Sequence, residues 1–380
     1  MPRRPRRPVR QWPVPARWLL GLLTVVTVAS APACGASSAP EAAPPTSSEP
    51  TRSAATAASP DPTANADPEP GPISIAFTGD VHFESQLRSR LDDPATALAP
   101  IAAQLSDADL TVVNLETSIG TSGTREPKRF TFQAPPQAFD ALAASGVDVV
   151  TMANNHGMDF GTGGLADTLA AIPQAPVSVV GIGSDADAAF APALHEVNGT
   201  TVAVIGASSA DDPTADPTAH WAADDNTPGI AVAADPARLV DAVHDARGAA
   251  DVVVVFMHWG IQGDRCPSTS QTTTARALAD AGADVVVGSH AHVVQGAGML
   301  EDTYVAYGLG NFVWYTNGSE AASTTGVLTL TLDSGTVVGE RWAPARIQDD
   351  GLPRFSSGAE AETAAATFAA RRACTDLVAL

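Results

Sequence analysis

The chain has 380 residues, of which 42 are acidic and 21 basic, and its formal charge at pH 7 is −21. A surface this acidic repels nucleic acid and anionic membranes, so we expect no nucleic-acid partner for the mature protein. The length is sufficient for one large domain or two modest ones.

The first 33 residues have the pattern of a bacterial export signal. Six arginines fall within the first 17 residues, and an apolar run over 18–28 is followed by small residues that lead to Cys34. The run is short for a membrane-spanning helix, and its small-residue exit suits cleavage by a peptidase. We predict a signal peptide over 1–33 and acylation of Cys34, which would make the protein an exported lipoprotein on the extracytoplasmic face of the cell membrane. Plain secretion and an uncleaved anchor are the alternatives.

Composition divides the rest of the chain into three parts. Residues 34–71 are almost wholly Ala, Pro, Ser, Thr, Glu and Asp, which cannot form an apolar core, so this part is predicted to be a disordered tether. Residues 72–345 form the main domain, and 346–380 are expected to pack on it as a C-terminal extension. Cys266 and Cys374, an even pair in an oxidising compartment, predict a disulfide between that extension and the loop after Trp259; two free thiols are the alternative.

Short β-branched runs alternate with Ala- and Leu-rich stretches through the main domain. The predicted strands are 73–77, 110–113, 147–152, 177–180, 202–205, 252–256, 285–287, 304–307 and 327–332. The predicted helices are 138–145, 164–171, 236–247, 273–281 and 359–370. This alternation is typical of an α/β fold, and these strands are many for one sheet. We therefore predict two stacked mixed β-sheets flanked by helices, with a hairpin over 326–342 and a surface loop or lid over 210–229.

Residues suited to acid–base or metal chemistry follow the first two predicted strands. Asp80 and His82 come just after Gly79, which lets the backbone turn, and they combine a hard oxygen ligand with an imidazole nitrogen. Asn114 and Glu116 end the next strand. The alternatives are structural: Asp80 could cap a helix beside a solvated His82, and Glu116 could belong to a capped loop.

Two amides and a histidine (Asn154, Asn155 and His156) follow the strand predicted over 147–152. Asn155 can offer a neutral oxygen to a metal. His156 can give a proton or a positive charge to a substrate, and Asp159 can orient His156. A purely structural turn is the alternative.

Three more histidines stand at strand ends farther along the chain. His258 leaves a run that should be buried on both faces, and a buried structural histidine is the alternative there. His290 and His292 follow Gly288 with one residue between them, a spacing that can direct both rings at one ion or at two neighbouring ions. Asn311 follows the strand over 304–307, and we interpret it as a wall or supporting element.

The carboxyl ends of neighbouring strands in an α/β sheet converge, and ligands bind outside them. Five of the chain's eight histidines fall at such ends, together with Asp80, Glu116 and Asn155. These are more ligands than one cation needs. The economical arrangement is a carboxylate that bridges two divalent ions, with nitrogen and oxygen ligands completing each.

Six ordered motifs are similar to those of the CapA-type proteins, which are associated with bacterial capsule or poly-γ-glutamate biosynthesis. The motifs span residues 73–312 and are centred on Asp80, Glu116, the Asn154–His156 turn, His258, the His290–His292 pair and Asn311. Residues 130–136 also resemble that family. The fold of these proteins resembles that of the calcineurin-like metallophosphoesterases, so the resemblance implies an αββα sandwich.

The resemblance implies two divalent metal ions (manganese, iron or zinc) and a ligand set for each. The ligands of the first ion would be Asp80, His82 and His292. The ligands of the second ion would be Asn155, His258 and His290. Glu116 would bridge the two ions, although it replaces the Gly-Asp element usual at this place. Many CapA-type members look apolar where this chain has His82.

The same resemblance implies roles beside the ions. His156 would face the leaving group, with Asp159 orienting it. The residues expected to contact the substrate are Asn114, Arg129, Phe132 and Asn311. We predict an exported hydrolase in which metal-activated water attacks a phosphoester or an amide-type bond, in the context of a cell-envelope polymer. The alternative is a non-catalytic accessory subunit of the membrane-bound machinery that synthesises or exports that polymer.

Overall fold

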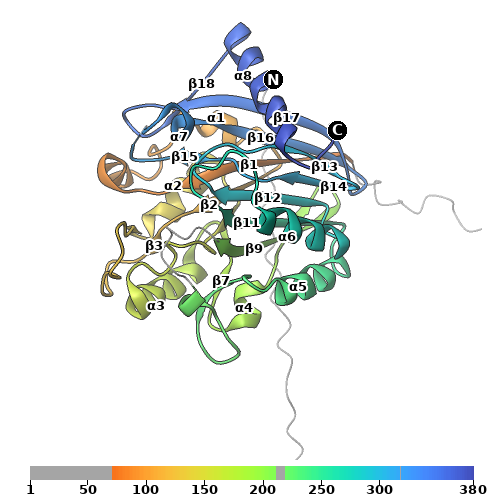
Figure 1. Ribbon diagram of the computed structural model, residues 1–380. Coiled ribbons are helices and arrows are strands. Elements are labelled where there is room, and N and C mark those ends of the chain that lie inside the picture. Colours follow the sequence, from red (N-terminus) through yellow and green to blue (C-terminus); the bar gives the residue numbers. More distant parts are fainter. Residues whose placement is uncertain (1–70, 211–218, 317) are drawn as a thin grey trace, which may run out of the picture. The chain divides into compact units, whose positions relative to one another are not determined.

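The computed structural model describes residues 71–210, 219–316 and 318–380 (Figure 1). The predicted signal peptide, the acylation site at Cys34 and nearly all of the predicted tether lie outside the described residues. No helix within these ranges is long and apolar enough to cross a membrane.

Within the described residues, the first β-sheet has eight strands in the order β18-β17-β16-β1-β2-β5-β6, with β15 beside the end of β1. Strands β1, β2, β5 and β6 run parallel, and β16, β17 and β18 continue the sheet antiparallel. The bounds are β1 Ile73–Val81, β2 Leu110–Leu115, β5 Val149–Thr151, β6 Ser178–Val180, β15 Asn311–Val313, β16 Thr324–Asp333, β17 Thr336–Ile347 and β18 Pro353–Phe355.

The second sheet has six strands in the described part of the chain, in the order β13-β14-β12-β11-β9-β8. Its four inner strands run parallel, and both edge strands run antiparallel to their neighbours. The bounds are β8 Ala193–Val197, β9 Thr200–Ala210, β11 Val252–Gly260, β12 Val285–His290, β13 Ala297–Leu300 and β14 Thr303–Ala306. Two small strand pairs lie outside both sheets: β3 Ser118–Ile119 with β4 Gln133–Ala134, and β7 Ile182–Gly183 with β10 Gly229–Ile230.

Helices cover the outer face of each sheet. Those that pack into the core beside the first sheet are α1 Ala102–Leu105, α2 Gln137–Ser145 and α3 Gly161–Ala171. Those beside the second sheet are α4 Ala186–Phe190, α5 Ala237–Arg247 and α6 Thr269–Asp280. Figure 1 shows α5 and α6 next to β11. The remaining helices are α7 Glu320–Ser323, α8 Gly358–Ala370 and four 3₁₀ segments: η1 Ser85–Asp92, η2 Ile172–Gln174, η3 Ala219–Trp221 and η4 Arg371–Cys374.

Alternate side chains of each central strand face different layers, as the pleat of a strand requires. In β1, Phe77 packs into the core between the two sheets, whereas Ala76 packs toward the helices. In β11, Phe256 and Met257 divide in the same way. Every residue of β2 and β11 is buried, in agreement with the predominantly apolar sequences of these strands. The layers are helix, sheet, sheet, helix, and the predicted fold class is confirmed.

The predicted strands and helices all overlap observed ones, and the predicted hairpin is β16 with β17. The strands that were not predicted include β8 and β13, the two edge strands of the second sheet, whose short sequences lack a long β-branched run. From the predicted loop or lid over 210–229, the structure describes residue 210 at the end of β9 and residues 219–229. There Trp221 is buried in the core beside the first sheet.

The C-terminal extension continues the first sheet. Strand β17 runs through position 345, and β18 pairs with it, so the predicted boundary at 345 falls inside a strand. Farther along, the ring of Phe368 in α8 stacks on Trp342 with ring centroids 4.3 Å apart. A disulfide joins Cys266 to Cys374, as predicted.

Candidate metal centre

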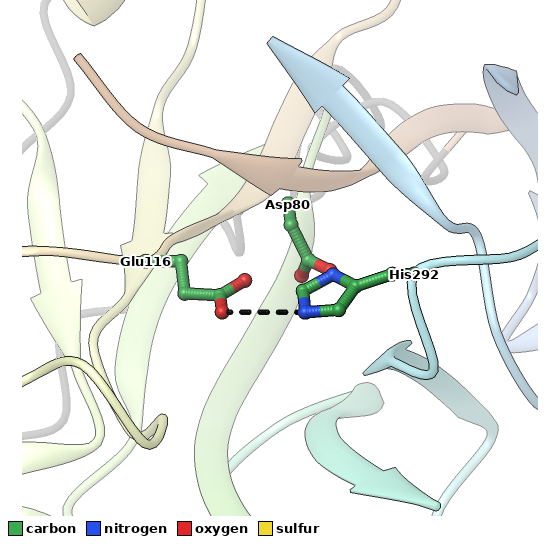
Figure 2. Close-up of side chains that lie close together, drawn as sticks. All are labelled: Asp80, Glu116 and His292. Atoms are coloured by element: carbon green, nitrogen blue, oxygen red, sulfur yellow. Dashed lines mark hydrogen bonds and ion pairs between the residues drawn. The ribbon is translucent and has the colours of Figure 1, made fainter. Parts of the chain in front are cut away.

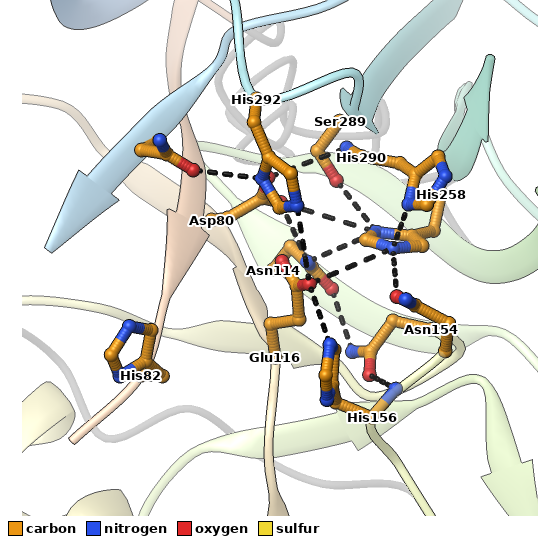
Figure 3. Close-up of polar contacts among 12 residues, drawn as sticks. Asp80, His82, Asn114, Glu116, Asn154, His156, His258, Ser289, His290 and His292 are labelled. Carbon is orange, nitrogen blue, oxygen red and sulfur yellow. Dashed lines mark hydrogen bonds and ion pairs between the residues drawn. The ribbon is translucent and has the colours of Figure 1, made fainter. Parts of the chain in front are cut away.

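The polar residues at the strand ends meet where the two sheets come together (Figure 3). Strand pairing places Asp80 of β1 level with Asn114 of β2 and with Asn311 of β15. It also places His258 of β11 level with Ser289 of β12. Asn114 connects the two sheets, because its Nδ2 lies 2.8 Å from Asp80 Oδ1 and 3.2 Å from His258 Nδ1.

Asp80, Glu116 and His292 form the first ligand group (Figure 2). One candidate ligand atom from each lies within 4.8 Å of the others. His292 Nδ1 is 3.1 Å from Asp80 Oδ2, and His292 Nε2 is 3.9 Å from Glu116 Oε1, so the imidazole lies between the two carboxyl groups. Hard oxygens beside an imidazole nitrogen suit a divalent cation.

Glu116 is buried without a donor for its charge. Among the described residues, neither carboxyl oxygen accepts a hydrogen bond from an N–H group, and Asp80 is a second acid beside it. Burial, and then the negative charge of Asp80, raise the pKa of Glu116 well above its usual value. Three histidine Nε2 atoms surround Glu116 Oε1: His156 at 3.6 Å, His292 at 3.9 Å and His258 at 4.0 Å. A carboxylate and several basic nitrogens facing one point are the donor set of a cation site, so the residues present fit a divalent metal.

Asp80 differs from Glu116 because donors surround it. Burial raises its pKa, but the hydrogen bond and charge of His292 and the amide of Asn114 outweigh that effect, and the pKa falls below its ordinary value. The backbone N–H of His290 also donates to Asp80 Oδ2 at 3.3 Å. Asp80 is therefore ionised and held in place before any cation binds.

Asn155, His258 and His290 form the second ligand group. His258 Nε2 lies 2.7 Å from Asn155 Oδ1 and 3.0 Å from His290 Nδ1. The other nitrogen of His258 faces Ser289 Oγ at 3.1 Å. Burial, and then the neighbouring His290, hold the pKa of His258 well below its usual value, so the ring is neutral and can donate an electron pair to a metal.

The backbone of the His290–His292 pair explains how its rings converge. Both residues have positive φ, 88° and 55°, which costs a non-glycine residue about 1–3 kcal/mol. Two hydrogen bonds hold this backbone: the one from His290 N–H to Asp80, and one from Gly263 N–H to the carbonyl of Ala291 at 2.9 Å. Strained backbone of this kind persists only where its surroundings enforce it, and it is common at functional sites.

His156 is oriented by Asp159, as the sequence predicts. Its Nδ1 lies 2.5 Å from Asp159 Oδ2, which also accepts the backbone N–H of Phe132 at 2.6 Å. The other oxygen, Oδ1, lies 2.6 Å from Lys128 Nζ. Burial lowers the pKa of His156, and Asp159 only partly offsets this, so the ring is neutral with its proton on Nδ1 and its lone pair on Nε2, toward Glu116.

His82 is not brought into either ligand group, contrary to the prediction. Its Nδ1 accepts the backbone N–H of Glu84 at 3.0 Å. Its ring packs among those of Phe132, Trp314 and Tyr315, with centroid distances of 4.7, 4.2 and 4.9 Å. In Figure 3 His82 stands apart from the other histidines. The ring therefore serves an aromatic cluster beside the centre, and we remove it from the set of metal ligands.

The residues predicted to contact substrate make contacts with neighbouring side chains of the centre or of the surface around it. Asn114 connects Asp80 to His258, and Asn311 Oδ1 lies 2.8 Å from His292 Nδ1, so both amides orient predicted ligands. Phe132 stacks on His156 with a centroid distance of 4.1 Å. The Arg129 guanidinium lies over the ring of Phe130, 4.9 Å from its centroid, and takes part in neither ligand group.

Other residues that build the centre were not predicted to do so. Asn154 Nδ2 donates to Asn114 Oδ1 at 3.0 Å and to the carbonyl of Leu115, and Asn154 Oδ1 accepts the N–H of His156. Its position next to the predicted ligand Asn155 is the sequence feature that could have indicated this role. Lys128 stands out in the sequence because it is the chain's only lysine, but its place beside the centre was not predicted. Gly263 carries no sequence signal for its contact with Ala291.

Comparison with known proteins assigns the chain to a family. The family model described as bacterial capsule synthesis protein PGA_cap matches residues 74–316, so the chain belongs to this family. That span contains both ligand groups, His156 and Asp159.

Curated relatives carry related names. The chain is 36% identical over 188 residues to the PGA biosynthesis protein CapA of Bacillus subtilis, covering 49% of this chain and 48% of that protein. It is 32% identical to the capsule biosynthesis protein CapA of Bacillus anthracis, covering 56% and 51%. A probable polyglutamine synthesis accessory protein of Mycobacterium tuberculosis is 30% identical, covering 62% and 65%. The chain spans about half the length of the two Bacillus relatives.

Solved structures with a similar arrangement include a phosphatase from Mycoplasma pneumoniae, 12% identical with a TM-score of 0.46, covering 77% of this chain and 97% of that one. Another is a 5′-nucleotidase from Candida albicans, 11% identical with a TM-score of 0.41, covering 79% and 58%. Similarities at this level carry no conclusion about function.

Proposed function

We propose that the protein is an exported, lipid-anchored hydrolase of the cell envelope, which uses two divalent ions to cleave a phosphoester or an amide-type bond. The single observation that carries the proposal is the environment of Glu116, a fully buried carboxyl group without a donor, faced by three histidine nitrogens. A bound cation would compensate the buried charge, which the positive charge of Lys128 offsets only in part.

Each ligand group would hold one ion. Asp80 and His292 would serve the first, the second ligand group would serve the other, and Glu116 lies where it can reach both. Manganese, iron and zinc all accept this mixture of oxygen and imidazole nitrogen. When bound, such ions supply Lewis acidity and a water molecule of lowered pKa.

His156 is the proposed proton-transfer residue. Its Nδ1–H is donated to Asp159, which fixes the tautomer and the direction of the ring. Its Nε2 faces the centre, where it can take up a proton and pass it to a leaving group. Phe132 stacks on the ring and keeps water from that face.

The names of the relatives support a polymer of the cell envelope as the context. They refer to capsule, PGA and polyglutamine synthesis, and the chain belongs to the same family. The pattern of residues 1–34 supports export and acylation of Cys34. The proposed partners are therefore the membrane, through the lipid, and the polymer or its synthesis machinery.

A non-catalytic accessory role is the second candidate. The burial of the candidate metal ligands favours it. Asp80, Glu116 and His258 are fully buried, and only His292, with 19% of its side chain exposed, reaches solvent to a notable extent. A substrate would need this centre to open. One relative also carries the words "accessory protein" in its name.

Metal content and hydrolysis, measured together on the full chain, test the proposal. The wild type is expected to bind about two Mn²⁺ or Zn²⁺ ions and to hydrolyse a p-nitrophenyl phosphodiester or a p-nitroanilide. His290→Ala should lose about one ion and activity by ~100-fold or more. His244→Ala, at an exposed histidine of α5, is the control and should change neither. A chain that binds no metal refutes the proposal. If the Asp80→Ala/His292→Ala variant restores polymer output in a deletion strain as fully as the wild type does, the hydrolase role is lost and the protein is an accessory subunit.

A further inference from the structure

Lys128 is the only lysine among the chain's 21 basic residues, and its side chain is enclosed although the residue as a whole is partly exposed. Only 5% of its side chain is exposed. An ammonium group removed from water costs several kcal/mol unless its donors are paired. The structure therefore has to compensate Lys128 closely, and its partners indicate what the residue does.

Three groups surround the Lys128 ammonium. Its Nζ lies 2.6 Å from Asp159 Oδ1 and also donates to the backbone carbonyl of Asn155. The third group is the ring of Trp221, with Nζ 4.9 Å from its centroid. A carboxylate, a carbonyl and a ring face match the three donors of an ammonium, which is a compact charge on a flexible stem.

Two of these partners belong to the turn that supplies the metal centre. Asn155 directs its side-chain Oδ1 at His258 Nε2, 2.7 Å away. Asp159 uses its other oxygen to hold His156 Nδ1. One ammonium therefore fixes both ends of the 155–159 segment, with His156 between them.

We propose that Lys128 is a positioning residue, which holds the 155–159 turn so that Asn155 Oδ1 and His156 Nε2 face the metal centre. This inference rests on the proposed function in treating that cluster as a metal centre. Lys128 itself touches neither a metal ligand's donor atom nor Glu116. Its direct contacts in the turn are the backbone carbonyl of Asn155 and the carboxylate of Asp159.

Trp221 extends this arrangement to a distant part of the chain. It follows β9 of the second sheet, is 3% exposed, and precedes Ala222, which bridges to Ile230 of β10. A side chain in the 219–230 segment thus covers the ammonium that holds the turn after β5. Substitutions of Trp221 should therefore alter the position of His156 without changing any candidate metal ligand.

Lys128→Met is the principal test, because methionine keeps the length of the stem and removes the charge. In the full chain its affinity for Mn²⁺ should fall by ~10–100-fold, as for loss of a group that supports ligands. In the metal-free protein, amide hydrogen exchange over residues 153–161 should quicken by ~10-fold, because charged hydrogen bonds of the turn are lost. Arg341→Met removes an exposed cation of β17, which pairs with Asp107, and should leave both measurements within about twofold of wild type.

A double variant shows whether Lys128 acts through Asp159. If it does, Lys128→Met combined with Asp159→Asn should lose less Mn²⁺ affinity than the product of the two single losses. Losses that multiply would mean that the two residues act separately and would overturn this part of the proposal.

Trp221→Leu provides a second variant in case Lys128→Met does not fold. Lys128 carries the only ε-amine, so acylation by an amine reagent, read by mass spectrometry, reports on its burial directly. Trp221→Leu should speed that acylation and quicken exchange over 153–161 by ~3-fold or more. Unchanged acylation and exchange would refute the coupling to Trp221.

The two proposals fail in different ways. A wild type that binds no Mn²⁺ or Zn²⁺ refutes the proposed function, while exchange over 153–161 still tests Lys128. A wild type that binds metal, beside a folded Lys128→Met with the same affinity and the same exchange, refutes the positioning role alone.

Discussion

Two stretches of this chain place metal-type residues two positions apart, and the fold uses them differently. In the first, Asp80 enters the metal centre while His82 lies in an aromatic cluster with Phe132 and Trp314. In the second, His290 and His292 both face the centre. The same spacing therefore brings both residues to the centre in one stretch and only one of them in the other.

The backbone accounts for the difference. After Asp80, the chain continues beside β15, with the N–H of His82 donating to the carbonyl of Val313 at 3.2 Å, and this carries the His82 ring toward Tyr315. In the second stretch, His290 and His292 adopt positive φ. A pair at i and i+2 therefore converges here because the turn is forced into a left-handed conformation, which the spacing alone does not require.

The sharpest test of this comparison substitutes the two residues of the first stretch one at a time. Asp80→Ala should reduce Mn²⁺ affinity by more than the ~10–100-fold that loss of a supporting group costs, because it removes a ligand. His82→Phe should leave the affinity within about threefold, and it should lower the free energy of unfolding by about 1–3 kcal/mol because the Glu84 N–H loses its acceptor. Isothermal titration and chemical denaturation measure the two effects. A large affinity loss in His82→Phe would restore His82 to the ligand set.

Glu116→Gln should weaken metal binding and yet stabilise the metal-free protein. The pKa of Glu116 is raised by burial and by Asp80, so its contribution to stability is present below the unfolded pKa, near 4.5, and is lost as pH rises toward the folded pKa. Glutamine carries no such charge, so above pH 4.5 the melting temperature of the metal-free variant should exceed that of the wild type by ~2 °C or more.

Calorimetry across pH 4.5–8, with chelator and with Mn²⁺, reads both parts of this prediction. Added metal should reverse the order, because only the wild type keeps the carboxylate. Equal melting temperatures of the two metal-free proteins at all pH values would show that ionised Glu116 does not destabilise the fold. The main support for a cation beside Glu116 would then be lost.

Much of this organisation follows from local patterns in the sequence. Strands with predominantly apolar sequences, such as β2 and β11, are buried on both faces, and the polar residues near their carboxyl ends then gather at one edge. The direction of His82 could not be predicted, because it depends on pairing with Val313, far along the chain. The role of Lys128 depends likewise on three contacts that only the folded chain brings together.

The smallest expected effect concerns the support of the second stretch. The Cys266–Cys374 disulfide anchors the loop that contains Gly263, whose N–H holds the carbonyl of Ala291 between the two histidines. Replacing both cysteines by serine should lower the free energy of unfolding by about 2–5 kcal/mol. It should weaken Mn²⁺ binding only ~2–10-fold, the worth of one hydrogen bond made less secure, and Asp80 should still be held by Asn114. An affinity loss as large as that of Asp80→Ala would mean that the disulfide, and not the local turn, holds the histidine pair in its left-handed conformation.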